Sequence, residues 1–417
     1  MTDVFRLSES AMATLAAGRS DHRILRLLRS AQLSKHLLLL RCIADAGPSQ
    51  TDAFEVLASA HRSAPAAVGD LLASPFVGAW AVRCIRSAGL VDLSYVANLA
   101  AAAALRAGVD VALTVTVRDG VVFLPTVGSV VLPSTVASAL VMVSGGRAVV
   151  CSETGSSADW REIRRLSADV NGHRSSVVFD DVDPYRDCYR MALPPAVGAK
   201  EFTTWEELFR AAWRLLALYD PAHAAELAGG LHTVVPLMRG STDPDLSATS
   251  GDAIGALALT LPDEPASLAV TLVHEFQHSK LSALLELVPL YDESATAAFF
   301  APWRRDPRPI GGLLQGAYAF LGVCEIWRRL RDCPSERVTA TTEFAVLREQ
   351  VRLALATLAS SSLLTAHGQR FVAGMRAALR PMLDEALPAA VVASAHESLA
   401  RNVEAWQRRN ATSVPRQ

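Results

Sequence analysis

The amino-acid sequence predicts an α+β protein that is predominantly helical, with a small antiparallel sheet in the middle of the chain. Apolar residues recur at helical spacing toward both ends, and short β-branched runs separated by glycine and proline occupy the middle. We expect a helical region over 1–108, a β-rich region over 109–200 and a second helical region over 201–417. The last two should form one compact domain.

The opening region should consist of amphipathic helices. Leucine and isoleucine form apolar stripes within residues 24–40. The alanine-rich stretch 99–105 is apolar, but arginine and aspartate follow it closely. An amphipathic helix is therefore expected there instead of a membrane span.

The middle region should begin with a β-hairpin. Residues 111–117 and 121–125 are rich in valine, and Asp119-Gly120 between them is a tight-turn pair. Further short strands are expected at 129–132, 139–143, 148–151 and 176–179.

The second helical region should contain a strand that leads into a long helix. Residues 254–259 form an apolar, strand-like run. Pro262 and Pro265 then lead into helical spacing that ends at Pro289. Further helices are expected at 205–219, 313–330, 344–358 and 368–379.

The composition argues against several classes of partner. Lys and Arg together number 40, Asp and Glu number 42, and the basic residues are scattered, so neither nucleic acid nor an anionic membrane is expected to bind. No segment has the length of a membrane span, and the first residues lack a signal-peptide pattern. The six cysteines form no CxxC pair. We therefore expect a cytoplasmic protein with reduced thiols.

The run His274-Glu275-Phe276-Gln277-His278 lies in the long helix and carries the strongest functional signal. Two histidines four residues apart lie on one face of a helix and can bind one metal ion. We therefore expect a zincin-like metal helix with His274 and His278 as ligands. In a zinc peptidase Glu275 would be the general base that activates metal-bound water. The strand before the helix would then hold an extended peptide by main-chain pairing, which favours a peptide substrate.

The third metal ligand decides the chemistry. Catalytic zinc takes a third protein ligand, and mononuclear iron oxygenases usually combine two histidines with a carboxylate. The third histidine of the metzincin pattern does not follow His278. Glu325 could offer a carboxylate from the later helix, as could Asp292 or Glu293 from the loop after Pro289. For each acid, a solvated surface position is the alternative.

The segment 301–309 contains three arginines, Arg304, Arg305 and Arg308, between prolines that restrict the backbone. Arginine binds a carboxylate through two parallel hydrogen bonds. A dicarboxylic co-substrate that chelates iron through one end needs such a partner for its other end. The alternative is a surface loop with ordinary ion pairs.

The chain resembles the HExxH-motif peptide-modification proteins of bacterial ribosomal-peptide gene clusters. That family is regarded as iron(II)/2-oxoglutarate-dependent peptide β-hydroxylases. The resemblance is carried by residues 179–186, 272–278, 301–309 and 312–316. It implies Fe(II) held by His274 and His278, with 2-oxoglutarate oriented by the arginines of 301–309.

Within that resemblance, Arg308 is the first choice for the co-substrate carboxylate and Arg304 the second. Relatives carry histidine before the glycine where this chain has Gln315-Gly316. Gln315 is therefore the first candidate for the third ligand, followed by Glu325, and an impaired site is the remaining alternative. Glu275 would order a histidine contact or the substrate.

Three hypotheses follow. The first is an iron(II)/2-oxoglutarate dioxygenase that hydroxylates the β-carbon of side chains in a ribosomal precursor peptide. The second is a zinc metallopeptidase that acts on a leader or small protein. The third is a non-catalytic peptide-binding protein with a degenerate metal site. In all three the expected partner is a peptide.

Overall fold

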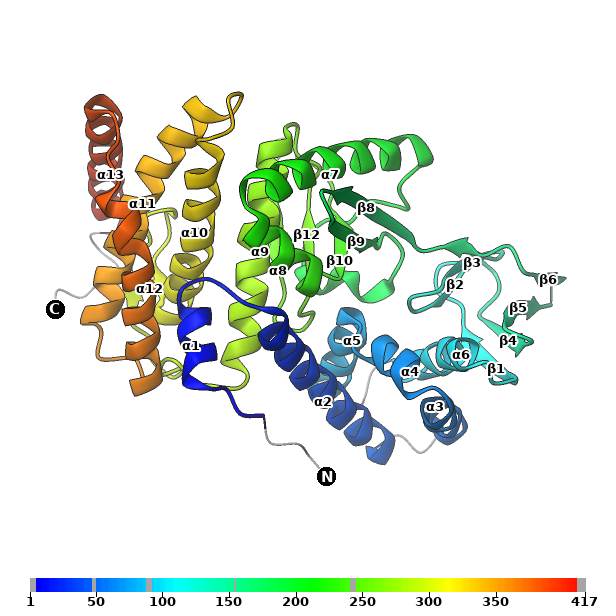
Figure 1. Cartoon of the computed structure of the whole chain (residues 1–417). Helices are drawn as coiled ribbons and strands as arrows, with labels where there is room; N and C mark the ends of the chain where they lie inside the picture. Colours follow the sequence, from blue (N-terminus) through cyan, green and yellow to red (C-terminus); the bar gives the residue numbers. More distant parts are fainter. Residues whose placement is uncertain (1–4, 47–49, 88–91, 154, 241–244, 411–417) are drawn as a thin grey trace.

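The structure is a computed structural model that describes residues 5–46, 50–87, 92–153, 155–240 and 245–410. Helices make up 57% of it, and the sheets are small (Figure 1). The predicted α+β, mostly helical class is therefore confirmed.

In the described part of residues 5–107, six α-helices precede the first strand, and local signals explain where several begin or end. Ser8 accepts a hydrogen bond from the Ala11 amide at the start of α1, and prolines open α4 and α5. Gly108 ends α6 in the left-handed conformation at φ 66°. The helices are α1 (Glu9–Ala16), α2 (His22–Ala46), α3 (Thr51–Ser63), α4 (Pro65–Leu72), α5 (Pro75–Arg86) and α6 (Tyr95–Ala107).

Two small antiparallel sheets follow these helices. The four-stranded sheet has the order β1-β4-β5-β6, and the three-stranded sheet has the order β2-β3-β7. Burial alternates residue by residue along β4, so one face of this strand is exposed. The strands are β1 (Val111–Thr116), β2 (Val121–Leu124), β3 (Gly128–Val131), β4 (Ser138–Ser144), β5 (Arg147–Ser152), β6 (Gly155–Ser157) and β7 (Arg161–Glu162).

The expected hairpin of 111–117 with 121–125 is wrong. Asp119 and Gly120 do form a tight turn with positive φ, closed by a bridge between Arg118 and Val121. Beyond that bridge the strands separate, because β1 pairs with β4 and β2 pairs with β3. The pairing of these strands is therefore determined by tertiary packing and not by the turn.

A five-stranded mixed sheet lies at the centre, in the order β11-β12-β10-β9-β8. Strands β9, β10 and β12 are parallel, and the two edge strands β8 and β11 run antiparallel to their neighbours. Strands β10 and β12 are buried at every residue, as expected of parallel strands covered on both faces. The strands are β8 (Arg164–Val170), β9 (His173–Phe179), β10 (Thr233–Pro236), β11 (Ser247–Thr249) and β12 (Ala256–Leu259).

This sheet separates two hydrophobic cores. Val234 and Leu257 face a core made with the carboxy-terminal helices, α1 and the start of α2. Their neighbours Val235 and Ala258 face a second core made with the rest of α2, helices α3–α6 and the antiparallel strands. Because successive strand residues point to opposite faces, each strand contributes to both cores. Helix α2 likewise joins both.

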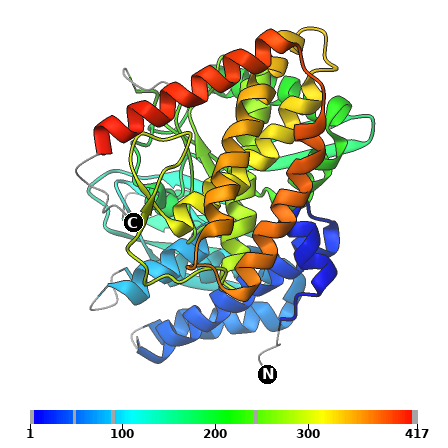
Figure 2. The same cartoon turned by 90° about the vertical axis from the view of Figure 1, so that its left-hand side faces the viewer.

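Helices α7–α12 pack on the first core, whereas the short helix η2 packs on the second. Helix α9 contacts α7, α8 and α10 as well as β11 and β12. Figure 2 shows the carboxy-terminal helices side by side, with α13 lying across them. The elements are the short 3-10 helix η2 (Pro184–Tyr189), α7 (Ala199–Tyr219), α8 (Pro221–Gly230), α9 (Pro265–Leu285), β13 (Ala298–Phe299), β14 (Arg308–Pro309), α10 (Ile310–Leu330), α11 (Arg337–Ser360), α12 (Ala366–Asp384) and α13 (Ala389–Asn410).

Helix α10 is long and apolar enough to cross a membrane by length and composition. However, 78% of its apolar window is buried inside the structure. That degree of burial is expected of a core helix. The cytoplasmic location stays a prediction.

Candidate metal centre

The HExxH run lies in α9, which Pro265 opens at its first position. His274 and His278 are half-buried on one face of the helix, and their Nε2 atoms lie 3.2 Å apart. Two nitrogens that bind one metal ion at about 2.1 Å would lie about 3.0–3.4 Å apart for octahedral or tetrahedral angles. The spacing of this histidine pair therefore fits one ion between the rings.

Burial keeps His274 in the form that can bind a metal. Burial, and to a smaller extent the neighbouring imidazole of His278, lowers the pKa of His274 to about 3. A neutral imidazole retains a lone pair for a metal, whereas a protonated one does not. His274 is thus prepared as a ligand near neutral pH.

Gln315 of α10 contacts the far side of His278. The Nδ1 of His278 lies 3.0 Å from Oε1 of Gln315, and the amide nitrogen of Gln315 donates to Ser282 at 3.2 Å. An amide oxygen accepts, so Nδ1 of His278 carries the proton and Nε2 faces His274 with its lone pair. Such an outer partner fixes the tautomer and orientation of a metal-binding histidine. In this arrangement Gln315 orients a ligand and does not itself point between the rings.

Glu275 lies beside the edge strand β11. Its Oε1 accepts a hydrogen bond from Ser247 Oγ at 2.7 Å, and Thr249 also bonds to the carboxylate. Burial raises the pKa of Glu275, while the charge of His278 and the two hydroxyls act in the opposite direction. The carboxylate next to the histidine pair therefore fixes β11 against the helix.

The edge strand beside the helix is β11, and not the strand that the sequence suggested. The run 254–259 contains β12, which is hydrogen-bonded to β10 on one side and to β11 on the other. It cannot pair with a peptide, so the expectation for that strand is wrong. Strand β11 ends the sheet within the part of the chain that the structure describes. Its outer edge is free for main-chain pairing there.

An aromatic wall links the histidine pair to the segment 301–309. The ring of Phe320 packs edge-on against His274 at a centroid distance of 4.9 Å. Trp303 packs on Phe320 at 4.8 Å. A Cβ at Gly316 would lie 2.5 Å from the Trp303 ring, so only glycine allows this approach. The arginine-rich segment is thereby held next to the candidate metal site.

The arginines Arg304 and Arg308 share one carboxylate. Arg304 donates to Asp306 at 2.9 Å, and Arg308 lies 3.5 Å from its other oxygen. Both guanidinium groups are partly exposed. A co-substrate carboxylate would therefore have to displace Asp306 or bind the remaining donors.

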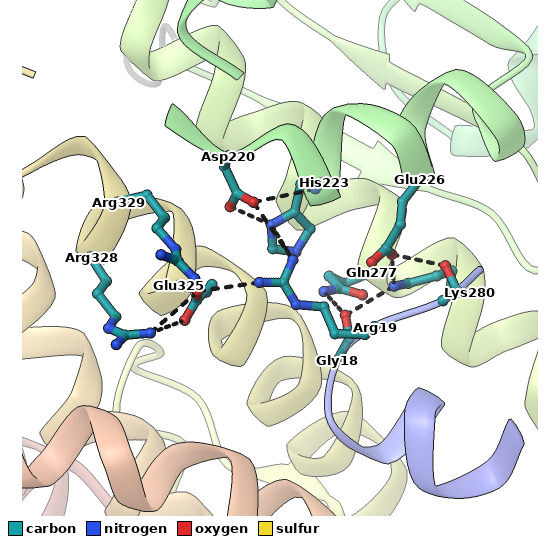
Figure 3. Close-up of polar contacts among 11 residues, drawn as sticks. Gly18, Arg19, Asp220, His223, Glu226, Gln277, Lys280, Glu325, Arg328 and Arg329 are labelled. Carbon is teal, nitrogen blue, oxygen red and sulfur yellow. Dashed lines mark hydrogen bonds and ion pairs between the residues drawn. The ribbon is translucent and has the colours of Figure 1, made fainter. Parts of the chain in front are cut away.

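Glu325 is not brought to the histidine pair. Arg19, Arg328 and Arg329 surround its carboxylate at 2.9–3.2 Å (Figure 3). It lies ten residues beyond Gln315 on α10, which is about 15 Å along the helix axis. The carboxylate of Asp292 also has partners elsewhere, because it accepts hydrogen bonds from the amide and the hydroxyl of Ser294 in an exposed turn.

A buried polar network fixes the back of the motif helix (Figure 3). Gln277 and Lys280 both donate to the carbonyl oxygen of Gly18, at 2.8 and 3.0 Å. Lys280 also pairs with Glu226 of α8 at 2.5 Å. The chain between α1 and α2 is thus bound to α9, which sets the rotation of the helix that carries the histidines.

Among the described residues, no group of three or more His, Cys, Asp and Glu side chains is placed to hold a metal ion. The described chain offers two imidazole ligands and no third ligand of these types. An iron- or zinc-dependent reaction would need the remaining positions to be filled by water, a co-substrate or another donor.

Sequence reasoning missed three contributors to the site: Ser247, Ser282 and Phe320. Ser282 lies four residues after His278, and Phe320 lies four residues after Gly316, so helical spacing could have found them. Ser247 lies in a polar run that carries no strand signal. Its contact with Glu275 depends on the pairing of β11 with β12.

Compared with models of known protein families, the chain matches none, and none of the curated proteins matches it either. The functional argument therefore depends on the site itself.

Proposed function

We propose that the protein is an iron(II)/2-oxoglutarate-dependent hydroxylase of side chains in a ribosomal precursor peptide. The observation that carries the proposal is the pair of Nε2 atoms of His274 and His278, 3.2 Å apart and half-buried. The orientation of His278 by Gln315 supports the same role. The peptide-hydroxylase chemistry rests on the resemblance described above.

The number of protein ligands leaves room for a chelating co-substrate. Catalytic zinc sites hold three protein ligands, and the described residues here supply two. A co-substrate that chelates through two oxygens would add two ligands to the histidine pair, and the position that a carboxylate usually takes at such iron sites would be filled by water or another donor. Bound iron would supply oxygen activation, with 2-oxoglutarate oxidised to succinate and carbon dioxide as the peptide C–H becomes C–OH.

The protein side chains would bind and orient the reactants. The free edge of β11 would pair with an extended peptide, and Glu275 would hold that edge against the helix through Ser247. Arg308, with Arg304 as second choice, would bind the distal carboxylate of 2-oxoglutarate in exchange for Asp306. Trp303 and Phe320 would keep water from the site.

A zinc peptidase is the second candidate, and Glu275 is the observation that favours it. A buried carboxyl group with a raised pKa, next to both the histidine pair and a free strand edge, suits a general base that activates metal-bound water. This candidate requires neither oxygen nor 2-oxoglutarate.

The test is to add iron(II) and then 2-oxoglutarate to the metal-free protein without oxygen, and to record the weak visible charge-transfer absorption of chelated iron. We expect a band that disappears in His274→Ala and that needs more 2-oxoglutarate in Arg308→Ala. Arg305→Ala is the matched control, because Arg305 is an exposed arginine of the same segment. Absence of the band, together with tight zinc binding and peptide cleavage without oxygen, would replace this proposal with the peptidase.

A further inference from the structure

A cleft of about 960 Å³ lies on the other side of the central sheet from the motif helix. Val178 and Thr233 line it, and they alternate with Val177, Phe179 and Val234, which belong to the core shared with α9. The cleft and the histidine pair therefore lie on opposite faces of the sheet.

Four arginines from four separate elements line this cleft: Arg29 of α2, Arg106 of α6, Arg147 of β5 and Arg165 of β8. Arg106 donates to the side chain and the carbonyl of Thr126, and Arg165 donates to the side chain and the carbonyl of Ser176. These contacts hold the guanidinium groups in place without neutralising them.

The positive charge of the cleft is largely uncompensated. Within the described residues, Arg106, Arg147 and Arg165 have no carboxylate partner, and Arg29 pairs with Asp70, whose side chain is 71% exposed. Glu162 is exposed at the rim.

The other acids of the wall are buried. The carboxylates of Asp180 and Asp183 accept hydrogen bonds from backbone amides, and burial raises the pKa of both. Burial, and to a smaller extent the charges of Arg29 and Arg165, lowers the pKa of His232 to about 3. The cleft is therefore prepared for an anion.

The start of α5 adds to this field. Ser74 and Pro75 line the cleft, and Ser74 makes no side-chain cap to the helix in the described structure. The positive end of this twelve-residue helix therefore lies at the same cleft as the arginines.

We propose that this cleft binds an acidic segment of a peptide through Arg106, Arg147 and Arg165. The three arginines come from three separate elements around a cavity of about 960 Å³, which suits several carboxylates on an extended chain. Trp160, held by its hydrogen bond to the Ala148 carbonyl, and neighbouring apolar side chains offer surface for uncharged residues between the acids. The peptide assignment rests on the proposed function, in which a peptide is the substrate, and adds a docking site away from the metal.

The experiment is a fluorescence-anisotropy titration of the full chain, without metal, using a short fluorescein-labelled peptide rich in glutamate. The same peptide with glutamine at each glutamate, inorganic phosphate and ATP are the other probes. We expect saturable binding of the glutamate peptide that weakens with salt, and about tenfold weaker binding in Arg147→Ala and in Arg165→Ala. Arg174→Ala, an exposed arginine of β9 paired with Asp169, should bind like the parent protein.

Equal binding of the glutamine peptide, or unchanged binding in both cleft variants, would overturn the proposal. Tighter binding of ATP or phosphate than of the glutamate peptide would overturn the peptide assignment. His274→Ala should leave peptide binding unchanged, so loss of metal binding and loss of docking are measured separately. Circular dichroism of each variant shows whether the variant is folded, so that weaker peptide binding is not confused with unfolding.

Discussion

Replacing Gln315 with methionine should weaken metal binding about tenfold to a hundredfold while the protein remains folded. The substitution keeps the length of the side chain and removes two neutral hydrogen bonds, to His278 at 3.0 Å and to Ser282 at 3.2 Å. Each is worth about 0.5–1.5 kcal/mol, so the free energy of unfolding should fall by about 1–3 kcal/mol. The loss in affinity arises because His278 is then free to rotate or to change tautomer.

Isothermal titration with cobalt(II) measures the affinity, and denaturant unfolding measures the stability. Gln369→Met, at an exposed position of α12, is the matched control and should change neither. Unchanged cobalt affinity in Gln315→Met would refute the orienting role. A changed visible cobalt spectrum, which reports a changed ligand set, would instead make Gln315 a ligand, as the family resemblance implies.

Three further substitutions test the packing beside the site, a buried histidine and a buried ion pair. Gly316→Ala places a Cβ 2.5 Å from the Trp303 ring, so it should lower the free energy of unfolding by about 1–3 kcal/mol and alter tryptophan fluorescence. Burial lowers the pKa of His36 below 6.5, so the unfolded chain takes up a proton below about pH 6.5 that the folded chain does not. The contribution of His36 to stability should therefore fall as the pH falls, by at most about 1.4 kcal/mol per pH unit, and His36→Gln should reduce the slope by that contribution in denaturant titrations. Lys280→Met leaves Glu226 buried without its cation and should cost about 3–5 kcal/mol in thermal unfolding, much of which Glu226→Gln should restore.

Each of these expectations has a contradicting result. An unaltered tryptophan spectrum in Gly316→Ala would mean that the ring does not lie over α10. Identical pH slopes with and without His36 would mean that this group does not set the acid sensitivity. Equal stability of Lys280→Met and the double variant would mean that the pair is not coupled.

The fold class could be predicted from the sequence because periodicity is local. The valine-rich strands and the apolar stripes of the helices can each be recognised from the residues of a single segment. Strand partners are not local, which is why the tight turn at Asp119-Gly120 predicted the wrong pairing for β1. Strand β11 carries no apolar alternation at all, because its three residues are small, half-buried and at an edge.

The histidine pair could be predicted because helical spacing alone places His274 beside His278. The other candidates depended on contacts between helices. Gln315 and Glu325 lie on one helix ten residues apart, so helix geometry excludes that both contact one ion. The sequence does not show whether Gln315 or Glu325 points toward α9. That depends on how α10 packs on α9.

The central claim is that His274 and His278 together hold one metal ion. The most direct measurement is X-ray absorption of the cobalt(II)- or iron(II)-loaded protein, with metal content determined for His274→Ala, His278→Ala and the exposed control His367→Ala. We expect one ion per chain with two imidazole ligands, lost in both motif variants and retained in the control. Metal content that survives either motif substitution, or a spectrum without imidazole ligands, would contradict it.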